Sequence, residues 1–159
     1  MTSQPTLYLS NWSSHRTPGM HGPGRKFTIM ARPRAWERGV GALAALVPPV
    51  SAQRMLPDLL KDRHTGSASL LGDVYRTLCE GHFDARAAHL YPGALVAYDA
   101  DGFTTPAEDG DTLCCACSVA EARAGRCHRT WAAPFLVRAG WRVVLDGQPY
   151  ASNPEKATT

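Results

Sequence analysis

The residues best suited to chemistry lie in the last third of the chain, where a Cys-His-Arg triplet precedes an apolar stripe with helical spacing. Cys127, His128 and Arg129 are therefore expected at the start of a helix. A helix start presents unpaired N–H groups and a positive dipole end, which favour anions. Arg129 can bind a phosphate or carboxylate through two hydrogen bonds, and a thiol at this place would have a lowered pKa. The alternative is that Cys127 is a small core residue and His128 caps the helix.

Three further cysteines end an apolar segment of strand length over residues 112–117. Because side chains alternate along a strand, Cys115 and Cys117 are expected on one face and Cys114 on the other. With Cys127 and His128 they supply soft ligands within 14 positions, but the paired C-x-x-C spacing of a zinc knuckle is missing. Core or pocket lining is the favoured interpretation, so neither a metal ligand nor a cofactor is predicted. Without a visible secretory signal, the thiols are expected to be reduced.

A second polar group follows the β-prone residues 6–9. Ser10, Asn11 and Ser13 carry short hydroxyl and amide side chains that suit a sugar or phosphate, and Ser118 offers another hydroxyl after the cysteines. His15 and Arg16 come next in the same loop. We predict that these residues contribute to ligand binding, with His15 as a second candidate acid or base beside His128. A plain surface loop is the alternative, because loops of this composition are common.

Strand, helix and strand over residues 112–145 form the pattern of a right-handed parallel crossover. The pattern predicts a Rossmann-like α/β domain over residues 1–150, a three-layer sandwich with a mainly parallel sheet, followed by a flexible tail over 151–159. It further predicts that the strands at 112–117 and 141–145 are adjacent. Ligands in such sheets bind outside the carboxyl ends of the strands. Three segments should converge there: residues 10–15, the residues after Cys117, and the triplet at 127–129.

The remaining segments carry weaker signals. Apolar spacing predicts helices over 52–63 and 70–80, the second one ended by Gly81. Residues 27–30 are expected to form a strand or a turn, and residues 40–47 a strand or a helix end. A strand is expected at 95–98, and the acidic residues over 99–111 are expected to form a solvated turn.

Composition and charge exclude several classes of protein. The 159 residues are 44% hydrophobic and 19% charged, which is typical of a globular domain and excludes a collagen or a disordered chain. No apolar stretch is long enough to span a membrane, and with no visible secretory signal a cytoplasmic location is expected. Residues 1–63 hold nine Lys and Arg against three acids, whereas residues 64–159 hold eight against eleven. The basic stretch over 15–38, with Arg16 and Arg25, suits an anion site or a solvated basic face.

The segment from Leu113 to Cys117, followed by Cys127, His128 and Arg129, resembles the bacterial and phage domain-of-unknown-function 488 family. The resemblance covers residues 112–146, and residues 8–33 are loosely similar. It implies a Rossmann-like fold with the Cys-His-Arg triplet bordering the pocket. It carries no settled activity. The chain departs from the family in its three clustered cysteines and in a longer spacer over 118–126.

Together these features predict a site for a small phosphorylated ligand or nucleic acid, with no membrane partner. The first hypothesis is a nucleotide- or nucleoside-processing enzyme, either a hydrolase or a glycosyl-transferring enzyme. Its nucleophile would be Cys127 or Cys117. The second is a non-catalytic accessory protein that binds a nucleotide or nucleic acid. The third is a metal or redox site built on the cysteines.

Overall fold

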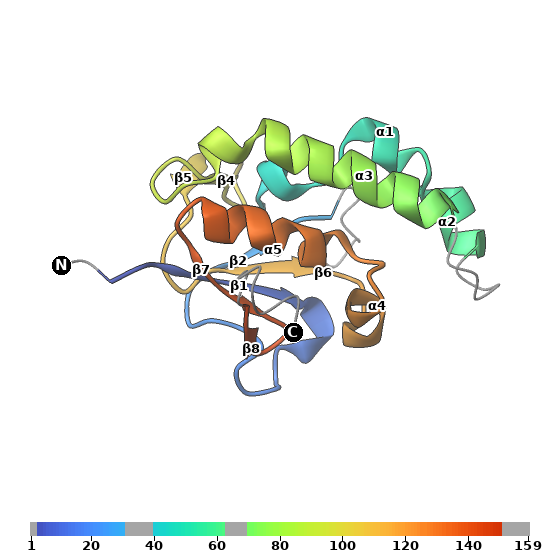
Figure 1. Cartoon of the computed structure of the whole chain (residues 1–159). Coiled ribbons are helices and arrows are strands. Elements are labelled where there is room, and N and C mark those ends of the chain that lie inside the picture. Colours follow the sequence, from blue (N-terminus) through green and yellow to red (C-terminus); the bar gives the residue numbers. More distant parts are fainter. Residues whose placement is uncertain (1–2, 31–39, 63–69, 151–159) are drawn as a thin grey trace.

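A single mixed sheet forms the centre of the computed structural model, which describes residues 3–30, 40–62 and 70–150 (Figure 1). Five described strands run parallel, in the order β3 (Gly41–Ala42), β2 (Lys26–Thr28), β6 (Thr112–Cys115), β1 (Thr6–Asn11), β7 (Arg142–Leu145). Antiparallel strands extend both edges: β4 (Val96–Tyr98) and β5 (Thr104–Pro106) beside β3, and β8 (Gln148–Pro149) beside β7. The predicted α/β class and the mainly parallel sheet are therefore confirmed.

The first strand lies inside the parallel region, between β6 and β7. Leu9 of β1 pairs with Leu113 of β6 on one side and with Leu145 of β7 on the other. The prediction that the strands at 112–117 and 141–145 are adjacent is therefore wrong, although both run parallel as expected. The connection between β6 and β7 is long enough to pass over one strand. Leu7 and Leu9 are fully buried, as expected for an interior strand of a parallel sheet.

The described helices that pack on the strands gather on one face of the sheet (Figure 1). Helix α5 (His128–Arg138) contacts β1 and β7, and α3 (Leu70–Ala85) packs against α5. Edge-to-face ring pairs join the two helices, Tyr75 with Trp131 and Phe83 with Phe135. The shorter helical segments are α1 (Val50–Gln53), α2 (Leu56–Asp62) and α4 (Val119–Arg123), with 3₁₀ turns η1 (Trp12–Ser14), η3 (Ala44–Leu46) and η5 (Ala87–His89).

A loop covers part of the opposite face of the sheet. The segment after η1 returns across β1, and a Cβ placed on Gly22 would lie 2.4 Å from the ring of Tyr8. Only glycine allows the backbone to approach the sheet so closely. The described residues provide a loop on this face where a three-layer sandwich has helices, so they do not establish the predicted third layer.

Several predicted boundaries differ from the structure. Helix α3 continues through Gly81 to Ala85, because Phe83 is buried against α5 and anchors the last turn. The helix expected over 52–63 is divided into α1 and α2, with Pro57 in the first turn of α2. Helix α5 begins at His128 and contains Pro134. The acidic segment includes a strand, β5, that the sequence did not indicate.

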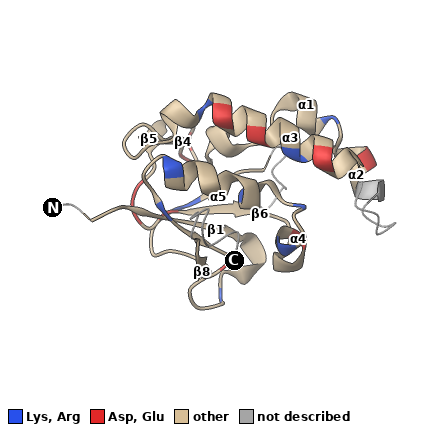
Figure 2. Cartoon of the chain, in the orientation of Figure 1, with Lys and Arg blue, Asp and Glu red and all other residues tan. Residues whose placement is uncertain are grey.

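No helix in the described part of the chain is long and apolar enough to cross a membrane. The predicted tail over 151–159 lies outside the described residues. So does the central part of the basic stretch, residues 31–39. Charged residues gather on α3 in the described part, whereas β1 and β6 carry none (Figure 2).

Candidate functional site at the carboxyl ends of β1 and β6

The connections that leave β1 and β6 run in opposite directions. The two strands are parallel neighbours, with Asn11 opposite Cys115 at their carboxyl ends. From β1 the chain passes β6 to reach β2, and from β6 it passes β1 to reach β7. Such a reversal is a topological switch point, the place where open α/β sheets bind their ligands. The residues that follow these two strands are therefore the candidate site.

The three segments expected to converge do meet at this end of the sheet. Ser10 and Asn11 end β1, and Cys117 and Ser118 follow β6. Arg129, in the first turn of α5, donates from Nη1 to the carbonyl of Cys117 at 2.8 Å and from Nη2 to the carbonyl of Ser118 at 3.2 Å. These bonds join the loop after β6 to the start of α5.

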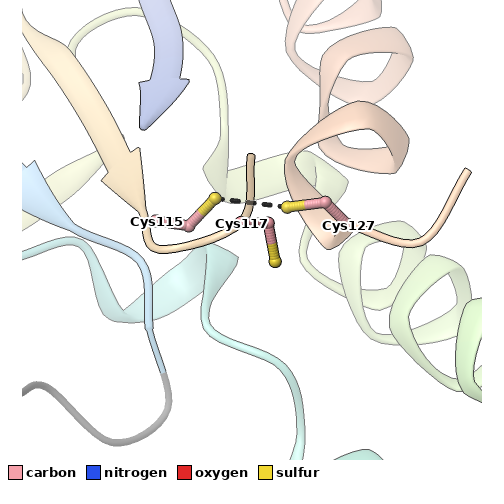
Figure 3. Close-up of side chains that lie close together, drawn as sticks. All are labelled: Cys115, Cys117 and Cys127. Atoms are coloured by element: carbon pink, nitrogen blue, oxygen red, sulfur yellow. Dashed lines mark hydrogen bonds between the residues drawn. The ribbon is translucent and has the colours of Figure 1, made fainter. Parts of the chain in front are cut away.

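Three cysteine sulfurs lie together between that loop and α5 (Figure 3). The Sγ atoms of Cys115, Cys117 and Cys127 are all within 4.8 Å of one another, and those of Cys115 and Cys127 are 3.2 Å apart. Cys115 and Cys127 are buried in the hydrophobic core on the helical side, and Cys117 is partly exposed. Cys114 is buried outside this cluster, as the strand alternation predicts.

Arg129 is the charged centre of the cluster. Its side chain is fully buried, and Nη1 donates to Cys115 Sγ at 2.8 Å. Nη2 and Nε lie 2.9 and 3.1 Å from Oδ1 of Asp146, which follows β7. The Cys-His-Arg triplet led us to expect an external anion as the partner of Arg129. In the structure every guanidinium nitrogen has an internal partner, and the acid is Asp146.

The three thiols of the cluster differ in how readily they ionise. Hydrogen bonds from the Cys117 and Cys127 thiols lower the pKa of Cys115 well below its ordinary value, and the Arg129 charge adds to this effect. The same hydrogen bonding to Cys115 raises the pKa of Cys117 to about 12 and that of Cys127 well above normal. Cys115 is therefore the thiol of the group that ionises first. The sequence analysis had proposed Cys127 or Cys117 as the nucleophile.

His128 faces the end of β2. Its Nε2 atom donates to the carbonyl of Ile29 at 2.8 Å, and burial lowers the pKa of the ring, so it is held neutral. This bond ties α5 to β2. His15, the other candidate acid or base, is exposed and its Nδ1 lies 3.2 Å from the carbonyl of Trp12. The two histidines thus have different surroundings, one within the core and the other on the surface of the loop after β1.

The loop residues after β1 differ in their availability to a ligand. Asn11 caps η1, since its Oδ1 accepts from Ser13 Oγ at 3.0 Å and from the backbone N–H of Ser14 at 2.9 Å. Ser13 and Arg16 are exposed. Ser10 is fully buried, and its Oγ has no hydrogen-bond partner. Ser118 caps α4 through Glu121 in a capping box.

Arg25 lies at the opposite end of the sheet. It immediately precedes β2, and its Nη2 is 2.8 Å from Oδ2 of Asp111, which precedes β6. It further donates to Thr105 Oγ1 at 2.7 Å and to the carbonyl of Pro106 at 2.8 Å. The structure therefore does not bring Arg25 together with the other predicted site residues, because parallel strands begin at the edge opposite to the one where they end. Asp111 is buried, so the expectation of a solvated turn is wrong at this residue.

Two residues of this region were absent from the sequence-based predictions. Asp146 was expected only as part of a turn, and its role depends on α5 bringing Arg129 to the end of β7. His21 lies beside the end of β1, where its Nε2 donates to the carbonyl of Asn11 at 2.7 Å and its buried Nδ1 has no partner. No spacing in the sequence links either residue to the cysteines.

Comparisons with protein families, curated proteins and solved structures found no match to this chain. The resemblance to the domain-of-unknown-function 488 family therefore stays a prediction, carried by the segment from Leu113 to Cys117 and the Cys-His-Arg triplet.

Proposed function

We propose that this chain binds a small phosphorylated ligand of the nucleotide or nucleoside class at the switch point between β1 and β6. The observation that carries the proposal is the divergence of the two connections at strand ends that carry polar and thiol side chains. The proposal keeps the Rossmann-like three-layer interpretation, which is supported by the parallel order of the five central strands.

Ser10 provides the most specific support for a ligand on the β1 side. A buried hydroxyl without a partner costs free energy, which a ligand or a bound water can recover. On the β6 side, Cys127 precedes α5 and makes no side-chain cap, and the positive dipole end of this helix favours an anion. Arg16, exposed on the loop after β1, adds positive charge. Arg129 supports the site by holding the loop of Cys117 and Ser118 in place.

An enzyme is favoured over a non-catalytic accessory protein by the Cys115 thiolate. A thiol whose pKa is lowered beside an arginine is typical of reactive cysteines. In a nucleotide- or nucleoside-processing hydrolase or glycosyl-transferring enzyme, such a thiolate would serve as nucleophile or base. The accessory alternative uses the same binding residues and does not require the thiolate.

Calorimetric titration of the reduced protein with nucleoside monophosphates tests the binding proposal. We expect saturable binding that weakens as salt rises, because it depends on charge. Ser10→Ala should weaken binding by about 2- to 10-fold, the value of one hydrogen bond, without loss of stability, since Ser10 has no internal partner. Ser51→Ala, at an exposed position of α1, is the matched control. Equal affinities for the two variants, or no binding at millimolar ligand, would overturn the proposal.

Product analysis separates the two classes of function. An enzyme converts a bound nucleotide or nucleoside, and Cys115→Ala abolishes the conversion while binding persists. An accessory protein returns the ligand unchanged in both the parent protein and the variant.

A further inference from the structure

The geometry points to a mononuclear soft-metal site formed by Cys115, Cys117 and Cys127, with Zn²⁺ as the ion of matching chemistry. The inference does not depend on nucleotide binding, because it concerns the sulfurs alone. The sequence analysis predicted no metal ligand from the missing C-x-x-C spacing. The fold replaces that local spacing by bringing a strand end, a loop and a helix start together.

The distances suit a tetrahedral ion. With Zn–S bonds of about 2.3 Å, two sulfurs of a tetrahedral site lie roughly 3.8 Å apart. The three Sγ atoms lie within 4.8 Å of one another, and the Cys115–Cys127 separation is 3.2 Å. Small side-chain rotations, with no movement of the strand or the helix, therefore suffice to place all three sulfurs around one ion.

The surroundings favour a metal over three free thiols. Cys115 and Cys127 are almost fully buried, where a thiolate without a partner is costly. A disulfide would join two sulfurs and leave the third beside it, whereas a metal ion uses all three. Thiolate ligands select soft or borderline ions such as Zn²⁺.

Arg129 lies outside the three sulfur ligands and donates to two of them. Its Nη1 reaches Cys115 Sγ at 2.8 Å and Cys127 Sγ at 3.5 Å, and N–H groups aimed at metal-bound sulfurs are typical of the surroundings that tune such sites. Three thiolates and a divalent ion carry one net negative charge, which lies against the guanidinium. Asp146 fixes that guanidinium from the far side.

The fourth coordination position has no protein ligand among the described residues. No His, Asp or Glu atom of the described residues joins the sulfur group. The Nε2 atom of His128 donates a hydrogen bond to the carbonyl of Ile29 instead. A site with three protein ligands leaves room for water or a substrate, which is the pattern of catalytic rather than structural zinc. The partly exposed Cys117 marks the side from which such a molecule would enter.

Cobalt titration of the whole chain tests this inference. The reduced, metal-free protein is titrated with Co²⁺ under anaerobic conditions, since tetrahedral cobalt–thiolate sites absorb strongly in the visible and near-ultraviolet. We expect one Co²⁺ per chain, displaced by Zn²⁺. Cys115→Ala and Cys127→Ala should lose the spectrum, and Cys117→Ala should bind at least tenfold more weakly. Cys114→Ala is the matched control because it changes a buried neighbour outside the cluster.

A second measurement on the unmodified chain covers variants that fail to fold. Zn²⁺ should slow alkylation of Cys115, Cys117 and Cys127 in partly unfolding conditions, as mapped by mass spectrometry, and leave Cys79 and Cys114 unchanged. The inference is overturned if the parent protein binds no Co²⁺ tetrahedrally. It is equally overturned if folded Cys115→Ala or Cys127→Ala protein keeps the spectrum, or if Zn²⁺ protects the five cysteines equally.

Discussion

Arginine–aspartate pairs lie at both ends of the parallel sheet, and their remaining contacts differ. At the amino ends, Arg25 is partly exposed and binds the buried carboxylate of Asp111. At the carboxyl ends, Arg129 is fully buried and binds Asp146. Arg25 directs its other donors to the Thr105 hydroxyl and the Pro106 carbonyl, whereas Arg129 directs its own to sulfur atoms and to the loop after β6.

Because their remaining contacts differ, the two ion pairs have different effects: one stabilises the fold, and the other acts on a cysteine as well. The Arg25 pair attaches the β5 edge strand to the start of β2, so its contacts stabilise the fold and touch no cysteine of the cluster. The Arg129 pair places a positive charge against Cys115, so the same residues that hold α5 also set the charge of the thiol. Loss of the first pair should affect stability alone. Loss of the second should affect both stability and cysteine chemistry.

Arg129→Ala should produce the largest effect. It leaves the Asp146 carboxylate without its partner in a nearly buried place, which costs about 3–5 kcal/mol of unfolding free energy. A loss of this size lowers the melting temperature by on the order of 10 °C, measured without ligand. Arg129→Lys, which keeps the charge, should lose less. A melting temperature unchanged in Arg129→Ala would contradict the internal role and restore an external partner.

Asp111→Asn should have a smaller effect, confined to stability. The carboxylate accepts from the Arg25 side chain and from the backbone N–H groups of Arg25 and Glu108. We expect a loss of about 1–3 kcal/mol in denaturant unfolding, with the cobalt and thiol chemistry unchanged. Glu108→Gln is the control, because Glu108 is exposed and its carboxylate is 3.8 Å from Arg25. If Asp111→Asn changes the cobalt spectrum or the thiolate absorbance of the cysteines, the two ends of the sheet are not independent.

Thiolate absorbance should show that Cys115, beside Arg129, ionises before the other cysteines. Because the pKa of Cys115 is lowered, its thiolate persists below the ordinary cysteine pKa of 9.0 and is protonated as the pH falls through the lowered value. The metal-free, reduced protein should therefore form its first thiolate well below pH 9, as measured by ultraviolet absorbance. Cys115→Ala should remove this signal and Cys114→Ala should keep it. A first thiolate that forms only near pH 9 would contradict this charge assignment.

Substitution of His21, in the loop over the end of β1, should produce the smallest effect on stability. Burial lowers the pKa of His21, so the unfolded chain binds a proton that the folded chain does not when the pH falls below the ordinary value of 6.5. Stability should thus fall on acidification through this range, by at most the slope of one proton for this residue. His21→Gln should flatten the pH dependence measured by denaturant unfolding, and His15→Gln, on the exposed part of the loop, is the control. An unchanged slope in His21→Gln would show that His21 does not contribute.

Local patterns in the sequence predicted the elements that carry the site. The β-prone residues 6–9 predicted β1, the apolar run over 112–117 predicted β6, and the stripe after Arg129 predicted α5. The rule on carboxyl ends then placed residues 10–15, 117–118 and 127–129 together. These inferences succeed because each depends on a short segment or on a general property of parallel sheets.

Contacts between distant segments could not be predicted in this way. Asp146 and Arg129 meet because α5 crosses β1 before the chain enters β7, and that strand order was predicted incorrectly. Arg16 and Arg25 are near in sequence but belong to different ends of the sheet, since the intervening loop runs back along β1. The sulfur cluster likewise depends on a strand end and a helix start, so the search for local metal-binding spacing missed it.

Amide NMR of the reduced protein, which maps a bound nucleoside monophosphate residue by residue, tests most directly which edge of the sheet binds the ligand. We expect chemical-shift changes at residues 10–13, 115–118 and 127–130, at the carboxyl ends of β1 and β6 and the start of α5. Residues 25–27 and 104–111, at the amino ends, should remain unchanged. Changes confined to the amino ends, or none at saturating nucleotide, would contradict the assignment of the functional edge.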